Sequence, residues 1–595
     1  MMPTSTRALR LPVHLVLLAL LATLIPLALS VSAEAAQPKP SSPRFGKAIE
    51  GYAPYEGNIL CDVVDKPGTT KLADLIRATY GSDESIGIAR NSCYTTSEHN
   101  DGRALDWMVD ATTRAGKAKA DAFLSWLLAT DANGNKHAMA RRLGIMYVIF
   151  NKRIWRAYGD PGWGSYSGTN PHTDHIHISL SYDGSTGRTS FWSGKPLQKP
   201  CATASLTSAA PRVQTDPMRY VPVSPTRLTS TESGAGTLNG PCRLFQGSGR
   251  RVDVQVTGIG PVPGKGVSAV ALNVAMRRPN WSAGLTAGPA GGDVPSVHRV
   301  SAAQNQISSS SMVLPVGADG KVSFFADFGA TDLDVSVVGY YVNPDARLSL
   351  RREIAVDGGD QFDAVRPQRL AVLSLGSSGA SKLTVAGQAG TDPASSSAIL
   401  SLTVNEGDGR GSLYAYPAGG NRPKVPVLTY RGGATTVQTS VPLGRGGAVV
   451  IENDGSDGRS VAVDVSGAYE PVALNGGHSL ALRGNPKTVV DSGSGRQWSK
   501  LAEGSTKDFS VSDAAPPDAA NVLLQVTVRR ATTSGKLTFW RSGGRRPGTT
   551  DLSIAPGQTI TGTVVAGIGD RGMVRVRNSG AKGVNVRITV LGSFR

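Results

Sequence analysis

The sequence is poor in aromatic residues and in charge: of its 595 residues, 6% are Phe, Trp or Tyr and 18% are charged. Long coiled coils need many charged positions, so this composition excludes them. The 40% hydrophobic content is too high for a disordered chain, and the 71 glycines show no every-third-residue period, which excludes collagen. Short strands joined by glycine turns fit better. The length predicts three to five domains, mostly β.

Long hydrophobic runs are also missing, apart from one near the N-terminus. Two arginines precede an apolar run at residues 15–29, and an Ala-Glu-Ala cleavage site ends at Ala35. This pattern predicts a signal peptide over residues 1–35, followed by a linker over 36–45. The alternative is a membrane anchor, but the run is shorter than the ~20 residues that span a bilayer and contains Pro26. We therefore expect a secreted protein with no transmembrane segment after cleavage.

Cysteine is scarce but even in number: Cys61, Cys93, Cys201 and Cys242. An even set in an oxidising compartment predicts disulfides, and three pairings are possible. The simplest is sequential, with Cys61–Cys93 inside the first domain and Cys201–Cys242 tying its exit to the next one. A thiolate zinc site is the competing interpretation, but no CxxC spacing supports it.

The net charge is +17, from 62 Lys and Arg against 45 Asp and Glu. In a secreted protein this favours anionic partners such as wall polymers, although basic charge also serves solubility alone. Nucleic-acid binding is not expected, because the sequence has no basic clusters interleaved with stacking aromatic residues.

Residues 46–200 combine helical and strand patterns. Apolar residues in 119–130 recur at helical spacing, and 70–80 indicates a shorter helix. The segments 145–150 and 175–182 indicate strands. We predict an α+β domain here.

Beyond residue 200 the helical periodicity disappears and the sequence repeats. Pro295, Pro423 and Pro547 follow similar Gly-Gly pairs at intervals of 128 and 124 residues. Three glycines that follow Val-rich or Leu-rich strands are spaced by 128 and 125 residues: Gly339, Gly467 and Gly592. A shared period predicts three homologous modules, each long enough for an all-β sandwich.

We place these modules at 215–345, 346–472 and 473–595. They resemble the β-rich repeats attached to secreted actinobacterial cell-wall hydrolases, and the resemblance implies a role in holding the protein at the wall. Three modules joined by linkers would bind a polymer with avidity.

Five of the eight histidines lie between residues 99 and 177. The first set is His99-x6-Asp106, with a glycine between that allows a turn. The second is His172-Thr-Asp-His175-Ile-His177, followed by Ser179. In a strand, His175, His177 and Ser179 would share one face, with an apolar face behind them. Imidazole and carboxylate side chains in this arrangement suit Zn²⁺.

The two sets together resemble the zinc metallopeptidases of the lysostaphin, D-Ala-D-Ala peptidase and hedgehog-type superfamily. The spacing of the second set is similar to that of penicillin-insensitive murein endopeptidases, and the pattern around both sets to a family of secreted actinobacterial domains. The resemblance covers about residues 51–182. It implies that His99, Asp106 and His177 are the zinc ligands, leaving a fourth position for water.

The same resemblance implies a general base beside the metal. By the H-x-H pattern this is His175, with His172 orienting it or sharing the role. The D-Ala-D-Ala peptidase branch instead has a glutamate three residues before the last ligand. That position is Asp174 here, whose side chain is shorter, so we favour His175.

Four residues are weaker candidates for substrate binding. Tyr158, Trp163 and Tyr166 lie in an aromatic, glycine-rich loop before the second set, and Arg90 precedes Cys93. The alternatives are that the loop aromatics pack on the core and that Arg90 is an ordinary surface arginine.

The leading hypothesis is a multidomain, secreted zinc metallopeptidase that cleaves peptide bonds of peptidoglycan, as a carboxypeptidase or an endopeptidase, held at the wall by the modules. The alternative is a non-catalytic, zinc-stabilised cell-wall binding or adhesion protein. An amidase that cuts between sugar and stem peptide would use the same metal chemistry.

Overall fold

The computed structural model describes residues 36–58, 62–90, 96–203, 205–209, 213, 215–245, 251–343, 359–471, 477–529 and 531–595. The predicted signal peptide lies outside these residues, as do Cys61 and Cys93. The described chain is mostly β, in several separate antiparallel sheets, as the composition predicts. None of its described helices is both long enough and apolar enough to cross a membrane.

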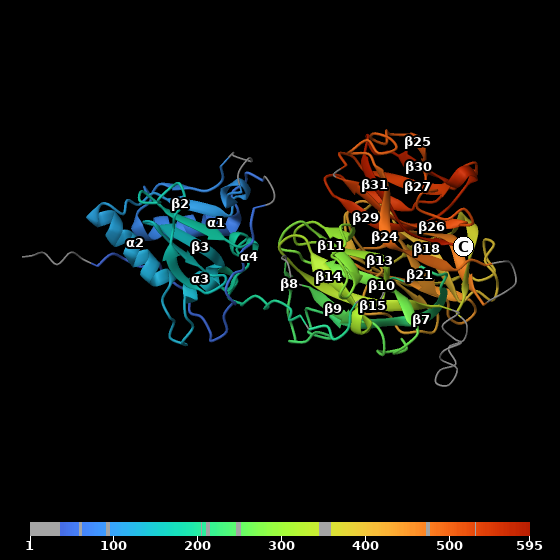
Figure 1. Ribbon diagram of the computed structural model, residues 1–595, viewed down its shortest axis with the longest axis horizontal. Helices are drawn as coiled ribbons and strands as arrows, with labels where there is room; N and C mark the ends of the chain where they lie inside the picture. The colour runs from blue at the N-terminus through green and yellow to red at the C-terminus, as the bar shows by residue number, and fades with distance from the viewer. Residues whose placement is uncertain are drawn as a thin grey trace, which may run out of the picture.

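The N-terminal domain is one six-stranded antiparallel sheet with helices beside it (Figure 1). The strand order is β1-β2-β6-β3-β4-β5. The strands are β1 (Ile86–Gly87), β2 (Ala104–Trp107), β3 (Ile145–Phe150), β4 (Arg153–Arg156), β5 (Gly162–Ser165) and β6 (Ile176–Leu180). The helices are α1 (Pro67–Tyr80), α2 (Arg114–Leu127), α3 (Ala138–Leu143), α4 (Tyr182–Ser185), α5 (Ser190–Ser193) and the 3₁₀ turn η1 (Glu98–Asp101).

The helix and strand expectations hold closely in this domain. Strand β3 has the predicted bounds, and α1 and α2 each begin earlier than predicted because Pro67 and the capping Thr113 start them. Strand β6 is shorter than 175–182 and begins after His175. Its apolar face packs as expected in the core: Ile176, Ile178 and Leu180 are fully buried.

Residues 219–594 form three groups of strands with the same topology, each made of two facing antiparallel sheets. In module 1 the sheets are β13-β10-β15-β7 and β12-β11-β14-β9, with β8 added at β15; in module 2, β16-β23-β18-β21 and β17-β22-β19-β20; in module 3, β24-β31-β26-β29 and β25-β30-β27-β28. Each pair of sheets encloses its own hydrophobic core, so the structure agrees with three sandwich-like repeats.

The strand bounds are as follows. Module 1 has β7 (Arg219–Ser230), β8 (Leu244–Phe245), β9 (Val252–Gln255), β10 (Val267–Arg277), β11 (Ala283–Pro289), β12 (His298–Ala302), β13 (Ile307–Pro315), β14 (Lys321–Ala326) and β15 (Ala330–Val342). Module 2 has β16 (Gln361–Leu375), β17 (Ala380–Thr384), β18 (Ser397–Val404), β19 (Arg410–Pro417), β20 (Leu428–Arg431), β21 (Thr435–Pro442), β22 (Ala448–Gly455) and β23 (Arg459–Glu470). Module 3 has β24 (Leu480–Asp491), β25 (Thr506–Ser510), β26 (Asn521–Arg529), β27 (Gly535–Arg541), β28 (Leu552–Ile554), β29 (Ile560–Gly567), β30 (Met573–Ser579) and β31 (Asn585–Phe594).

The glycine landmark of the repeat has a packing reason. A Cβ on Gly339 would lie 2.1 Å from the Tyr220 hydroxyl, and one on Gly467 would lie 2.3 Å from the Phe362 ring. In both modules an aromatic residue of the first strand therefore lies directly on the glycine of the last strand.

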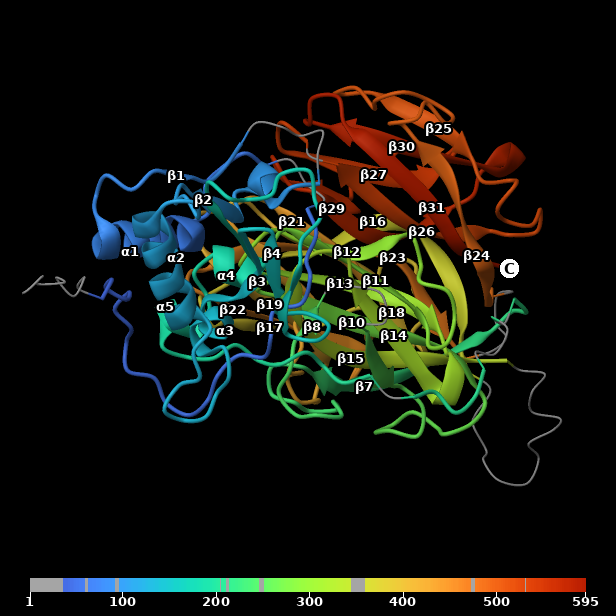
Figure 2. The same ribbon diagram turned by 60° about the vertical axis from the view of Figure 1, so that its left-hand side comes forward.

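The three modules lie together in one body (Figure 2). The chain segments that open them pair in a cycle through three backbone bridges: Met218 with Leu480, Tyr220 with Asp360, and Phe362 with His478. A shared apolar cluster with residues from all three modules lies at this junction. The modules are therefore packed against one another, so any binding sites on them are held in a fixed arrangement.

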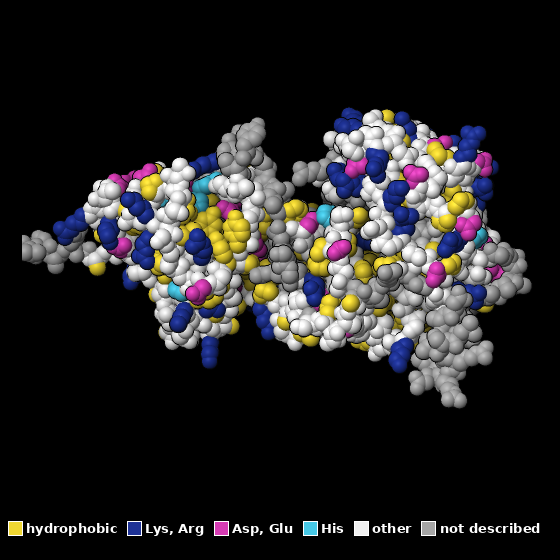
Figure 3. All heavy atoms as spheres, viewed as in Figure 1, with side chains coloured by type: hydrophobic (Ala, Val, Ile, Leu, Met, Phe, Trp, Pro, Cys, Tyr) yellow, Lys and Arg dark blue, Asp and Glu magenta, His cyan; other side chains and the backbone are white. Residues whose placement is uncertain are grey.

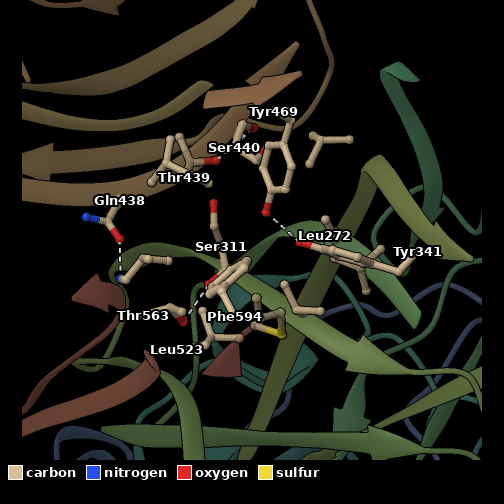
Figure 4. Close-up of a pocket in the computed structure, with 16 residues that line it drawn as sticks. Leu272, Ser311, Tyr341, Gln438, Thr439, Ser440, Tyr469, Leu523, Thr563 and Phe594 are labelled. Carbon is tan, nitrogen blue, oxygen red and sulfur yellow. Dashed lines mark hydrogen bonds between the residues drawn. The ribbon is translucent and has the colours of Figure 1, made fainter. Parts of the chain in front are cut away.

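Figure 4 shows the centre of this junction, where side chains of all three modules surround a cavity of about 40 Å³. The hydroxyl groups of Tyr341 and Tyr469 lie 2.9 Å apart, and the Thr563 hydroxyl donates to the Ser311 carbonyl at 2.9 Å. The cavity is large enough for water and too small for a sugar.

The N-terminal domain contacts module 1 through an aromatic and ionic patch. The Tyr182 and Trp281 rings lie 5.0 Å apart, and the Lys66 ammonium group lies 4.8 Å from the Trp281 ring centre. Arg188 donates to Asn305 at 2.8 Å. The predicted Cys201–Cys242 disulfide is present at the same junction. The two domains are therefore joined by more than a linker.

Candidate metal centre

Two neighbouring strands position two of the candidate ligands. Strands β2 and β6 are antiparallel partners, and their register places Asp106 directly opposite His177. The third residue, His99, lies in η1, just before β2, and the Ser97 side chain caps this turn by accepting from the His99 N–H. Gly102 ends the turn with a φ of +67°, a conformation that favours glycine. The short turn thus returns the chain to β2 with both side chains on one side.

The three side chains meet at one point. Asp106 Oδ1 lies 3.2 Å from His99 Nε2 and 2.9 Å from His177 Nδ1, and the two nitrogens are 3.3 Å apart. Ligand atoms at zinc distances stand about 3.4 Å apart in a tetrahedron. All three residues are at least nine-tenths buried. Among the described residues, this His-Asp-His group is the one that could hold a metal ion.

The outer nitrogen of each imidazole has its own partner. His99 Nδ1 lies 2.5 Å from the Ile88 carbonyl, so it is the donor there and Nε2 faces the site. His177 Nε2 lies 2.9 Å from the Ser179 hydroxyl. Partners of this kind fix the orientation and tautomer of metal-binding histidines. The geometry therefore presents His99 through Nε2 and His177 through Nδ1.

A second layer of polar groups continues from Ser179. Its hydroxyl donates to Glu98 Oε2 at 3.4 Å, and the Tyr147 hydroxyl donates to the same oxygen at 2.5 Å. Burial, reinforced by Glu98, raises the pKa of Tyr147 well above its usual value, which keeps the hydroxyl protonated as a donor. The sequence pattern placed Ser179 on the face of the histidines but missed Tyr147, because a tyrosine inside an apolar strand gives no separate signal.

Burial also sets the charge of the ligands. It lowers the pKa of His99 to about 3, with the neighbouring His177 adding to the effect, and it lowers the pKa of His177 to about 4. Both imidazoles are therefore neutral at neutral pH, which is the form that binds a metal.

The remaining residues of the second set lie beside this point. His175 Nε2 is 3.7 Å from Asp106 Oδ1, although His175 precedes β6 rather than lying in it. Asp174, with a side chain 66% exposed, accepts from His175 Nδ1 at 2.8 Å. The His172 ring lies 4.7 Å from the His175 ring, and its Nδ1 contacts the Asn170 carbonyl. The structure thus brings all three predicted catalytic residues to the site.

Arg90 reaches the site from a more exposed position. Its guanidinium contacts Asp106 Oδ2, leaving Oδ1 toward the two histidines. Arg90 is half-exposed, but its contact with the buried Asp106 carboxylate makes it part of the site rather than an isolated surface residue.

The loop aromatics divide between the site and its surroundings. The Tyr166 ring lies 5.2 Å from the His172 ring. Tyr158 packs against Tyr55 at 5.3 Å, and Trp163 lies under Arg153 in the β4–β5 hairpin. Of the three, Tyr166 contacts the histidine cluster directly. Figure 3 shows histidine side chains at the surface of this domain beside a hydrophobic patch.

Comparison with known proteins gives one family match. The model described as "VldE, C-terminal domain" matches residues 64–177, a segment that begins just before α1 and ends on His177. It includes both histidine sets and none of the three modules. A comparison with curated proteins finds no match.

Solved structures with limited similarity are viral and carbohydrate-binding proteins. The triple jelly roll protein of an archaeal virus turret is 10% identical in sequence, with a TM-score of 0.15. The alignment covers 67% of this chain and 98% of the viral chain. A tandem of CBM22 domains from Paenibacillus barcinonensis Xyn10C shares 10% identity, covering 39% and 99%, with a TM-score of 0.12. Over residues 64–177, this chain is similar to the family described as VldE, C-terminal domain.

Proposed function

We propose that this protein is an exported zinc hydrolase that cleaves peptide bonds of peptidoglycan and is held at the cell wall by its three modules. The observation that carries the proposal is the convergence of His99, Asp106 and His177, with His175 alongside. The residue types and the distances suit Zn²⁺, which prefers nitrogen and carboxylate ligands at about 2.0–2.2 Å.

Among the described residues, three side chains form the candidate metal group and no fourth joins them. A catalytic zinc site has three protein ligands and an open position, whereas a structural site has four protein ligands. When bound, zinc would polarise a carbonyl group and lower the pKa of a coordinated water to about 7.

The chain's own residues supply the proton transfers. Asp174 accepts from His175 Nδ1, so His175 Nε2 faces the site as an acceptor. It can take a proton there and return it to the leaving amine. Arg90 lies on the exposed side of Asp106, where a substrate carbonyl or carboxylate would approach.

The alternative, a binding protein that keeps its zinc as structure, is favoured by one contact. The Arg90 guanidinium neutralises Asp106 from the exposed side. If this ion pair persists with metal bound, the Arg90 side chain obstructs the path by which a substrate would reach the metal.

The test uses the full mature chain with purified peptidoglycan and with soluble stem peptides. Chain loaded with Zn²⁺ should release new amino groups, a chelator should stop the release, and added Zn²⁺ should restore it. Release of reducing sugar instead would contradict the assigned bond. The control is His298→Ala, a substitution in module 1 that leaves the centre intact. No product from zinc-loaded chain would support the binding protein.

A further inference from the structure

The groove between modules 2 and 3 is the second distinctive polar site of the molecule. It has a volume of about 630 Å³ and is lined by the start of β16 on one side and the β27 end on the other. This size accommodates several units of a polymer. Its apolar wall includes Val365, Phe539 and Ile568.

Three arginines line this groove: Arg366 from module 2, and Arg541 and Arg545 from module 3. All three are exposed, and none makes an ion pair or a side-chain hydrogen bond with the residues that the structure describes. Several other arginines of the modules have a partner: Arg575 pairs with Asp508, and Arg483 donates to the Ala514 carbonyl. The only acid lining the described groove is Asp363, so the groove is net positive.

A comparison of equivalent positions in the three modules shows that the two module 3 arginines have no counterpart in modules 1 and 2. Measured from the shared Gly-Gly pair, Arg541 occupies the place of Pro289 in module 1 and Pro417 in module 2. Arg545 likewise replaces Asp293 and Asn421.

On the module 2 side of the groove, the strand register shows that Arg366 likewise has no arginine counterpart at the equivalent positions of the other two modules. Pro222, Ala364 and Leu482 pair with the three landmark glycines, and two residues later stand Ser224, Arg366 and Gly484. At these homologous positions among the described residues, arginines stand on both sides of the groove only at the junction of modules 2 and 3.

A buried polar atom in the groove also lacks a partner. His478 lines the groove, and its buried Nδ1 makes no hydrogen bond to any described residue. Buried polar groups in proteins are nearly always hydrogen-bonded, so this nitrogen is a position in the groove wall where a polar partner would be favourable.

From these observations we infer that the module 2–3 groove binds an anionic polymer with phosphate or carboxylate groups spaced along a polyol or sugar chain. The guanidinium fork matches these oxyanions in geometry, and the apolar wall suits the carbon atoms of the polymer backbone. The inference deepens the wall-binding part of the proposed function and does not depend on the zinc centre.

The test compares full-length variants in titrations with polyglycerol phosphate, polyglucuronate and inorganic phosphate. Replacing all three arginines by Gln should weaken polymer binding at least about tenfold, since charge-assisted hydrogen bonds are lost. The control K382Q/K507Q/K582Q removes the same charge from exposed lysines outside the groove and should change binding less than about twofold. The polymer that binds more tightly identifies the oxyanion.

Three results would overturn the inference: equal loss in both variants, no binding of either polymer by the wild type, or equally tight binding of duplex DNA. Unchanged melting temperatures show that the variants are folded. Because binding is measured with a chelator present and hydrolysis is measured on a soluble peptide, failure here is separate from failure of the proposed hydrolase.

Discussion

Asp106 and His177 face each other across β2 and β6, with Asp106 Oδ1 2.9 Å from His177 Nδ1. The contact follows from backbone register, because antiparallel pairing fixes which residues stand opposite each other. Two of the three candidate ligands therefore rest on a sheet, and the third, His99, is supplied by a turn.

Ser179 should act as a positioning residue for His177. We expect Ser179→Ala to weaken metal binding by about 10–100-fold, because His177 loses the partner that fixes its tautomer. Competition with a chromogenic chelator measures this. Ser185→Ala is the control, since this buried serine caps nothing at the centre and contacts the Tyr182 carbonyl. Unchanged metal affinity in Ser179→Ala would contradict the role.

The Cys201–Cys242 disulfide should stabilise the junction of the first two domains. It closes a loop of 41 residues, and removing both cysteines as serines should cost about 2–4 kcal/mol. Denaturant unfolding of the oxidised chain and of the double variant measures the difference. If reducing agent lowers the stability of the double variant as much as that of the wild type, another disulfide accounts for the effect.

Phe362 should control the cohesion of the three modules. It is fully buried at their junction, 4.6 Å from the Phe594 ring and 5.4 Å from the Tyr469 ring. Phe362→Ala should destabilise the body by about 3–5 kcal/mol and split its calorimetric transition. Val372→Ala, at a side chain 56% exposed, should change little. Three separate transitions in the wild type would contradict a single body.

Asp551 should make the stability of module 3 depend on pH. Burial raises its pKa from 3.8 to about 7, so the folded chain binds more protons than the unfolded chain between these values. The contribution of Asp551 to stability is therefore largest below about pH 4, falls as pH rises to about 7, and is constant above it. Asp551→Asn should remove this fall, on the order of 2–4 kcal/mol. Urea titrations from pH 4 to 8 measure it, and an unchanged slope would be the contrary result.

Much of the site could be predicted from the sequence, because metal ligands leave a pattern of spacing. His99 and Asp106 stand seven residues apart around a glycine, and His177 alternates with apolar residues that face the core. The structure brings these residues together as expected. The placement of Tyr147 and Arg90 could not be predicted, since both depend on which strands and loops become neighbours.

The modules could also be predicted from the sequence only in part. Their repeat period predicted three similar units, because each unit repeats its own turns and strand glycines. Their cyclic closure could not be predicted, because the bridges of Met218, Asp360 and His478 join backbone atoms and require no particular side chain. The clustering of the groove arginines could not be predicted either, since Arg366 and Arg541 are far apart in the sequence.

The most direct test of the central claim compares His177→Ala with His175→Ala in the full-length chain. Zinc content after dialysis and turnover of a soluble stem peptide are measured on the same samples. The account predicts that His177→Ala loses the metal and the activity, whereas His175→Ala keeps one zinc per chain and loses at least about 100-fold in turnover. Retention of zinc by His177→Ala, or wild-type turnover by His175→Ala, would contradict it.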